Sequence, residues 1–205
     1  MAQLLADMLR LTSRLEVPLA LKEERPAWIN FRTATLWPPA SHPKLDFLAT
    51  GVQAPWIDEV ARAAKRVLLL MPAHDVVVGH SDFEAQNMRC SGTKLVAIYD
   101  WDSLVAERED VIVGQAAAVY TAHALPDPAV PRVPTPEQRW AFVHAYERAR
   151  DRSFNERELR SLVAASTWVT AYNARVNHAF GWGRQSGPGS HTEALRHLEH
   201  ELETV

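Results

Sequence analysis

Apolar residues recur at three- and four-residue intervals over much of the chain, which is the spacing of one face of an α-helix. This pattern predicts helices over residues 2–15 and 56–71, and Pro72 prevents the second from continuing. Ser153 or Asn155 can cap a later, long helix, because a short polar side chain accepts hydrogen bonds from the free N–H groups of a first turn. The later helices are expected at residues 109–124, 135–151, 155–178 and 191–203.

Two short stretches are strand-like instead. Residues 75–79 and 96–99 are rich in β-branched side chains, and a turn at residues 91–93 precedes the second. Residues 23–56 contain many prolines and tryptophans, which excludes a long helix and favours an ordered irregular segment packed on the body of the protein. Together these patterns predict a mainly α protein with a small β hairpin, in the α+β class.

Length and composition narrow the class of protein. The chain has 205 residues, 47% hydrophobic and 23% charged, as expected of one soluble globular domain over residues 1–205. A net charge of -3 argues against binding nucleic acid through its phosphates. The single cysteine, Cys90, excludes an internal disulfide, fits the cytoplasm and is expected to be a packed, inert thiol. No basic leader and no long apolar run occur, so we expect no membrane partner.

Polar side chains gather where the two predicted strands end. Asp82 and Asn87 lie in the loop after the first strand, and Asp100 ends the second. Carboxylate and amide oxygens converging from two elements suit a hard divalent cation such as magnesium. A carboxylate left free of the metal can orient a hydroxyl group and take its proton. The alternative is that these residues only form turns and caps, for which Asp and Asn are well suited.

The same segment carries a recognisable pair of motifs. Residues 80–87 fit H-x-D-x-x-x-x-N, and Tyr99-Asp100-Trp101-Asp102 follows. These motifs resemble the catalytic loop and metal segment of the aminoglycoside phosphotransferase family, kinase-like enzymes that phosphorylate small molecules. Family members commonly read G-H-x-D in the loop, as Gly79-His80-Ser81-Asp82 does here, and I-D-W-[DE] in the metal segment.

The resemblance implies a role for each matching residue. Asp82 is similar to the catalytic base, and His80 resembles the residue that braces the loop. Asn87 and Asp100 resemble the ligands of magnesium, through which ATP or GTP is held. Asp102 is expected to assist near the metal or to form a local hydrogen bond. In this family the C-terminal helices help to line the pocket for the hydroxyl acceptor, which makes Trp168, Tyr172 and Asn173 weak candidates for substrate contact; the alternative is that the first two are core residues.

The family's nucleotide-gripping lobe has no counterpart in the first part of the sequence. Ahead of Gly79 there is one glycine, Gly51, and no G-x-G-x-x-G motif. We therefore expect the C-terminal lobe of a kinase-like fold without its N-terminal lobe. It would comprise a helical lead-in (1–73), the catalytic loop and metal segment (74–110) and a helical substrate-side region (111–205).

Two functions remain open from the sequence. The first is a phosphotransferase that moves phosphate from ATP to a hydroxyl of a small molecule. The second is a catalytically inert lobe that acts as a binding or regulatory module, and a homo-oligomer stays open in either case. Two further alternatives are weaker: a metallohydrolase site using His74, His80 and Asp82, and a phosphate loop in the glycine-rich residues 181–189.

Overall fold

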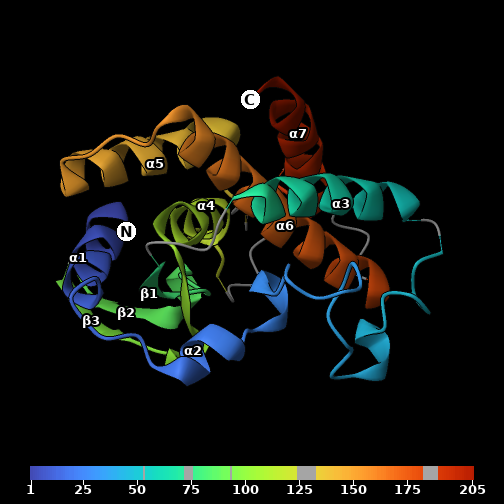
Figure 1. The fold of residues 1–205 in the computed structure, drawn as a ribbon, viewed down its shortest axis with the longest axis horizontal. Coiled ribbons are helices and arrows are strands. Elements are labelled where there is room, and N and C mark those ends of the chain that lie inside the picture. Colours follow the sequence, from blue (N-terminus) through green and yellow to red (C-terminus); the bar gives the residue numbers. More distant parts are fainter. Residues whose placement is uncertain (53, 72–75, 93, 124–132, 182–188) are drawn as a thin grey trace.

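A computed structural model describes the chain except residues 53, 72–75, 93, 124–132 and 182–188 (Figure 1). His74 and most of the glycine-rich stretch 181–189 thus lie outside the described residues. The helices are α1 (Ala2–Thr12), α2 (Leu19–Glu23), α3 (Pro55–Leu70), α4 (Glu109–Val119), α5 (Pro136–Arg150), α6 (Glu156–Ala179) and α7 (His191–Thr204). The strands are β1 (Val76–His80), β2 (Met88–Ser91), β3 (Lys94–Ile98) and β4 (Leu104–Arg108). Single 3₁₀ turns occupy Ala27–Ile29, Pro43–Leu45, Ala85–Asn87 and Trp101–Ser103.

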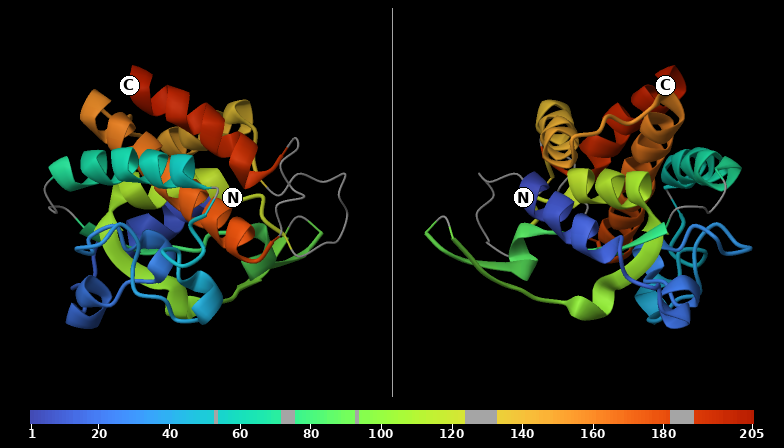
Figure 2. Two further views of the ribbon diagram at one scale, coloured as in Figure 1. Left: turned by 90° about the vertical axis from the view of Figure 1, so that its right-hand side faces the viewer. Right: turned by 60° about the vertical axis from the view of Figure 1, so that its left-hand side comes forward.

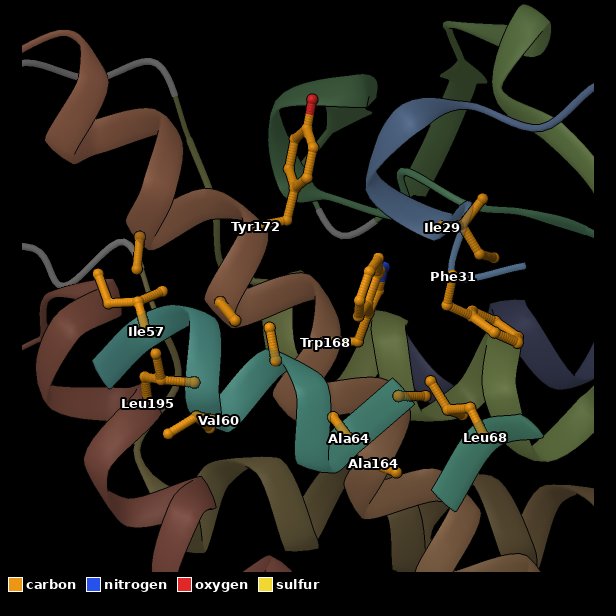
Figure 3. Close-up of a cluster of buried hydrophobic side chains, with 14 of the residues drawn as sticks. Ile29, Phe31, Ile57, Val60, Ala64, Leu68, Ala164, Trp168, Tyr172 and Leu195 are labelled. Atoms are coloured by element: carbon orange, nitrogen blue, oxygen red, sulfur yellow. The ribbon is translucent and has the colours of Figure 1, made fainter. Parts of the chain in front are cut away.

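Helix α6 is the central element of the fold. It packs against α4 on one side and against α3 and α7 on others (Figure 1). Helix α4 is buried over Asp110–Val119, as expected of a helix that is apolar nearly all round. Around α6 the apolar faces of α3 and α7 enclose one core cluster, with Trp168 and Leu68 among its members (Figure 3). A second core lies between α1, α4 and α5.

Helix starts follow their capping chemistry. At α6 the side chain of Asn155 accepts from the Glu158 N–H, and the Glu158 carboxylate accepts from the Asn155 N–H. Such a reciprocal pair satisfies two of the donors that every helix start leaves unpaired. The cap is therefore Asn155 and not Ser153. Helix α5 starts on an equivalent pair, Thr135 and Gln138.

The α+β class and the long helices are confirmed, but the strands are more numerous than the sequence pattern indicates. Strands β1 and β4 pair antiparallel with His80 opposite Leu104, and β2 and β3 form a separate antiparallel hairpin with Met88 opposite Ile98. The hydrophobic pattern did not predict β4, because this strand contains the charged residues Glu107 and Arg108, both of which are buried.

The irregular segment 23–56 is ordered and packed, as expected. Arg25 and Arg32 both bind the fully buried carboxylate of Glu107, with nitrogen–oxygen distances of 2.7 Å and 2.9 Å. Trp28 donates from Nε1 to the carbonyl of Ser81 at 3.1 Å. These contacts attach the segment to β4 and to the loop that follows β1. Among the described residues no helix is long and apolar enough to cross a bilayer.

Candidate active site

Strand pairing brings the two motifs together. The chain leaves β3 at Ile98 and passes through the turn Trp101–Ser103 into β4, whose first residue lies opposite His80. The ladder continues one step beyond the strands, because the Ser81 N–H donates to the Ser103 carbonyl at 2.9 Å. Asp82 and Asp100 are therefore near the same end of the β1–β4 pair, each a few residues beyond it.

Asp82 and Asn87 form a direct pair across the loop. Asn87 ends the 3₁₀ turn Ala85–Asn87, and its Nδ2 donates to the Asp82 carbonyl at 2.9 Å and to Asp82 Oδ2 at 2.8 Å. The five-residue spacing of Asp82 and Asn87 in the motif thus corresponds to a loop that these two hydrogen bonds close. With both amide hydrogens used, Asn87 Oδ1 receives no hydrogen bond from any described residue.

His80 connects this loop to the segment that contains Asp100. The side chain is buried, its Nδ1 accepts from the Asp82 N–H at 3.2 Å, and its Nε2 lies 2.9 Å from the Tyr99 carbonyl. Because Nδ1 accepts, the hydrogen must be on Nε2, which gives a neutral imidazole with both nitrogens satisfied. His80 therefore has the geometry of a brace between the Asp82 loop and the residue before Asp100.

Asp100 has an unusual backbone. Its φ of 64° and ψ of 46° are left-handed, which non-glycine residues adopt at a cost of about 1–2 kcal/mol and which often marks a functional position. Ser103 donates from Oγ to Asp100 Oδ2 at 2.9 Å, and this bond, together with one to Asp102, lowers the pKa of Asp100. Asp100 is exposed and ionised at neutral pH, and Asp102 is exposed beside it.

Burial has the opposite effect on Asp82. It raises the pKa of that carboxyl, the charge of Asp100 adds to the increase, and the Asn87 hydrogen bond partly offsets it. The two carboxyl groups have pKa values shifted in opposite directions, a pattern typical of a site in which one acid serves as a base and another stays ionised.

Glu84 is a residue of the site that the sequence analysis missed. Its side chain is buried, accepts a hydrogen bond from Gln86 and lies beside Asp82. Burial and then the charge of Asp82 raise the pKa of Glu84 to about 8. The sequence shows a third acidic residue within the motif, but it does not show that this residue is buried. The burial depends on the end of α4. There the carbonyls of Tyr120 and Ala122 accept hydrogen bonds from the N–H groups of Ala85 and Gln86.

Replacing Glu84 with glutamine is expected to make stability less dependent on pH. The folded protein holds a proton that the unfolded chain releases above the ordinary pKa of 4.5. The parent therefore loses stability as pH rises from that value through about 8, by at most about 1.4 kcal/mol per pH unit. Glutamine keeps an acceptor for Gln86 and has no proton to lose.

Urea denaturation at about pH 5 and about pH 9 measures this dependence. The exposed change Glu203→Gln is the control and should track the parent. Equal pH dependence in the parent and in the Glu84→Gln variant would contradict the assignment.

The candidate acceptor residues lie elsewhere in the fold. Trp168 and Tyr172 are buried members of the core cluster, with Trp168 packed against Phe31 and Trp37 (Figure 3). Asn173 beside them is half-buried. No recorded contact of these three residues reaches Asp82, Asn87 or Asp100, and the burial of the two aromatic residues favours the core interpretation.

Cys90 was expected to be packed and is exposed, so that expectation is wrong. It lies on the β2–β3 hairpin, which projects from the helical body and leaves most of β2 in solvent (Figure 2). Exposed aromatic residues also flank Asp100, because Tyr99 and Trp101 are each about half exposed. In the described ranges no group of three His, Cys, Asp or Glu side chains could hold a metal, so a magnesium ion here would need Asn87 and further ligands from phosphate.

Comparison with known proteins supports the fold. No family model and no curated protein matches the chain. A solved structure does match: the crystal structure of a spectinomycin phosphotransferase in complex with ADP and spectinomycin, with a TM-score of 0.52 and 16% sequence identity. The match covers 100% of this chain and 65% of that one. The chain therefore has the α+β fold of part of a kinase-like phosphotransferase.

Proposed function

We propose that this chain forms the base- and metal-binding part of an enzyme that transfers the terminal phosphoryl group of ATP to a hydroxyl group of a small molecule. The main support is the Asp82–Asn87 pair, held by His80 next to Asp100 at one end of the β1–β4 pair. The structural neighbour adds support, since that protein was crystallised with a nucleotide and a small molecule together. Its ADP favours an adenine nucleotide over GTP.

Asp82 is the proposed base. Asn87 holds Asp82 Oδ2, so the carboxylate is kept in one orientation and can accept the O–H of the acceptor. The proton moves from that hydroxyl to the Asp82 carboxylate as the oxygen attacks the terminal phosphorus and the bond from that phosphorus to ADP breaks. A pKa raised by burial brings Asp82 closer to the pH at which it works, which favours general-base catalysis.

Asn87 and Asp100 are the proposed magnesium ligands. Both offer oxygen, Asn87 Oδ1 is free of hydrogen bonds from described residues, and Asp100 uses one oxygen for Ser103. This donor set fits a hard cation that completes its shell with water and phosphate oxygens. Bound there, magnesium would neutralise phosphate charge. Ser103 and the left-handed backbone orient Asp100, and the low pKa of Asp100 keeps it charged.

Calorimetric titration with ATP, with and without magnesium, tests this proposal. Magnesium-dependent binding is expected to weaken about tenfold or more in Asp100→Asn, which removes the negative charge of one ligand, and in Asn87→Ala, which removes a ligand altogether. Glu203→Gln, on the exposed face of α7, is the control and should bind like the parent.

The inert-module alternative makes the opposite prediction. Absence of binding at millimolar ATP, or binding that ignores both magnesium and the two substitutions, would overturn the proposal and favour a lobe that has lost its chemistry.

A further inference from the structure

A cavity of about 530 Å³ lies in a part of the molecule that the proposed chemistry does not use. It is formed by residues 35–40 and 45–48 and by Asp58 and Arg62 of α3. None of its lining residues belongs to the β1–β4 region that contains Asp82 and Asp100. A volume of this size is within the range of pockets that bind small organic molecules.

The walls of the cavity are aromatic and rigid. Trp37 and Phe47 pack edge to face with ring centroids 5.3 Å apart, and both are largely buried. Tyr172 packs on both rings, and the ring centroid of Trp168 lies 5.1 Å from that of Trp37, so the aromatic wall is supported from α6. Such preformed walls bind a flat or aliphatic group without first having to become ordered.

The polar groups of the cavity are mostly acceptors. Pro38 and Pro39 have no backbone N–H, so that strip offers carbonyl oxygens alone. Asp46 Oδ1 accepts from the Leu48 and Ala49 N–H groups, and Oδ2 receives no hydrogen bond from described residues.

Asp58, like Asp46, has one carboxylate oxygen with described partners and one without. Its Oδ1 accepts from Trp37 Nε1 at 3.0 Å and is 3.1 Å from Arg175 Nε, while Oδ2 has no described donor. Arg175 balances the charge of Asp58, whereas Asp46 forms no ion pair with any described residue. Arg62 is exposed and has no ion-pair partner in the described part of the chain, so it can turn into solvent.

We infer that this cavity binds a small organic cation, an amine whose apolar body lies against Trp37 and Phe47 and whose ammonium group donates to the acidic side chains. Aromatic faces attract cations, and of the two aromatic walls Trp37 has no described cation over its ring. An ammonium group has donors and no acceptor, which complements a lining rich in acceptors. The inference does not rest on the proposed phosphoryl transfer, because neither nucleotide nor Asp82 takes part.

Two probes of matched shape and opposite charge test the inference: 4-phenylbutylamine and 4-phenylbutyrate, titrated into the full chain by calorimetry at neutral pH without nucleotide. The amine is expected to bind and the carboxylate to bind at least about fivefold more weakly, the effect of one partly exposed charge pair. No binding of the amine at millimolar concentration, or equal binding of the two probes, would overturn the inference.

Variants of two lining residues separate charge from fold. Asp46→Asn keeps an oxygen for the Leu48 and Ala49 N–H groups and is expected to weaken amine binding about fivefold. Arg62→Ala removes a like charge and is expected to strengthen it. Glu199→Gln on α7 serves as the control, and circular dichroism confirms that each variant is folded. An unchanged affinity in Asp46→Asn would show that the amine does not occupy this cavity.

Discussion

Substitution of Asp82 by asparagine is expected to lower the rate of phosphoryl transfer about 10³-fold, because a positioned base contributes roughly 10²–10⁴ to such a reaction. Asparagine has nearly the same shape, and its Oδ1 can still accept from Asn87 Nδ2. It cannot take a proton from the acceptor hydroxyl. The measurement is ADP release from ATP, with an acceptor that supports turnover by the parent.

The pattern across variants distinguishes a base from a structural residue. Asp82→Asn should leave magnesium-dependent ATP binding within about twofold of the parent, since Asp82 is not a proposed ligand, and should lower kcat with little change in KM. Asp102→Asn, at an exposed carboxylate nearby, should lower turnover far less. If Asp82→Asn retained parental kcat, the proposed role of Asp82 would be wrong.

Substitution of Gly114 by alanine is expected to destabilise the protein by about 3 kcal/mol, the upper end of what overpacking of a core costs. A Cβ atom at Gly114 would lie 2.3 Å from the Leu162 carbonyl oxygen, so two backbones would have to separate. Gly114 is on α4 and Leu162 on α6, and Ser166 Oγ also donates to the Gly114 carbonyl at 2.6 Å. Urea denaturation measures the loss.

The same substitution at Gly92 provides a matched control. Gly92 has a φ of 59° and nothing within 4 Å of an added Cβ, so Gly92→Ala costs only backbone strain, about 1–2 kcal/mol. A loss in Gly114→Ala no greater than that in Gly92→Ala would show that α4 and α6 are less closely packed than described.

The motif residues illustrate how far local sequence information reaches. The spacing of Asp82 and Asn87 is a local property, since the two side chains close one loop by hydrogen bonds within five residues. Their juxtaposition with Asp100 depends on the pairing of β1 with β4, a strand that the sequence pattern did not predict. Contacts between distant parts of the sequence were harder to predict. Trp28 donates a hydrogen bond to Ser81, but it could not be assigned to the site beforehand because it is distant in sequence.

The burial or exposure of several residues could not be predicted from the sequence, because it depends on how the whole chain packs. Glu107 and Arg108 are charged and yet buried. Arg25 and Arg32 compensate Glu107 from a distant segment, and Asp110 compensates Arg108 from two residues away. Glu84 is buried where its turn packs against the end of α4. Cys90 was expected to be buried and is exposed, because its hairpin projects from the body of the protein. A small apolar side chain gives no indication of this in the sequence.

Helical periodicity, capping chemistry and the paired motifs are short-range properties of the chain. The amino-acid sequence alone therefore determined the α+β class, the main helices and the choice of Asp82, Asn87 and Asp100 as candidate site residues. Packing of segments far apart in the chain decided everything that depends on burial. It raises the pKa of Asp82, adds Glu84 to the site and forms the aromatic cavity beside α3. The free energy of a charge or a ring depends on what surrounds it, and those surroundings come from the whole fold.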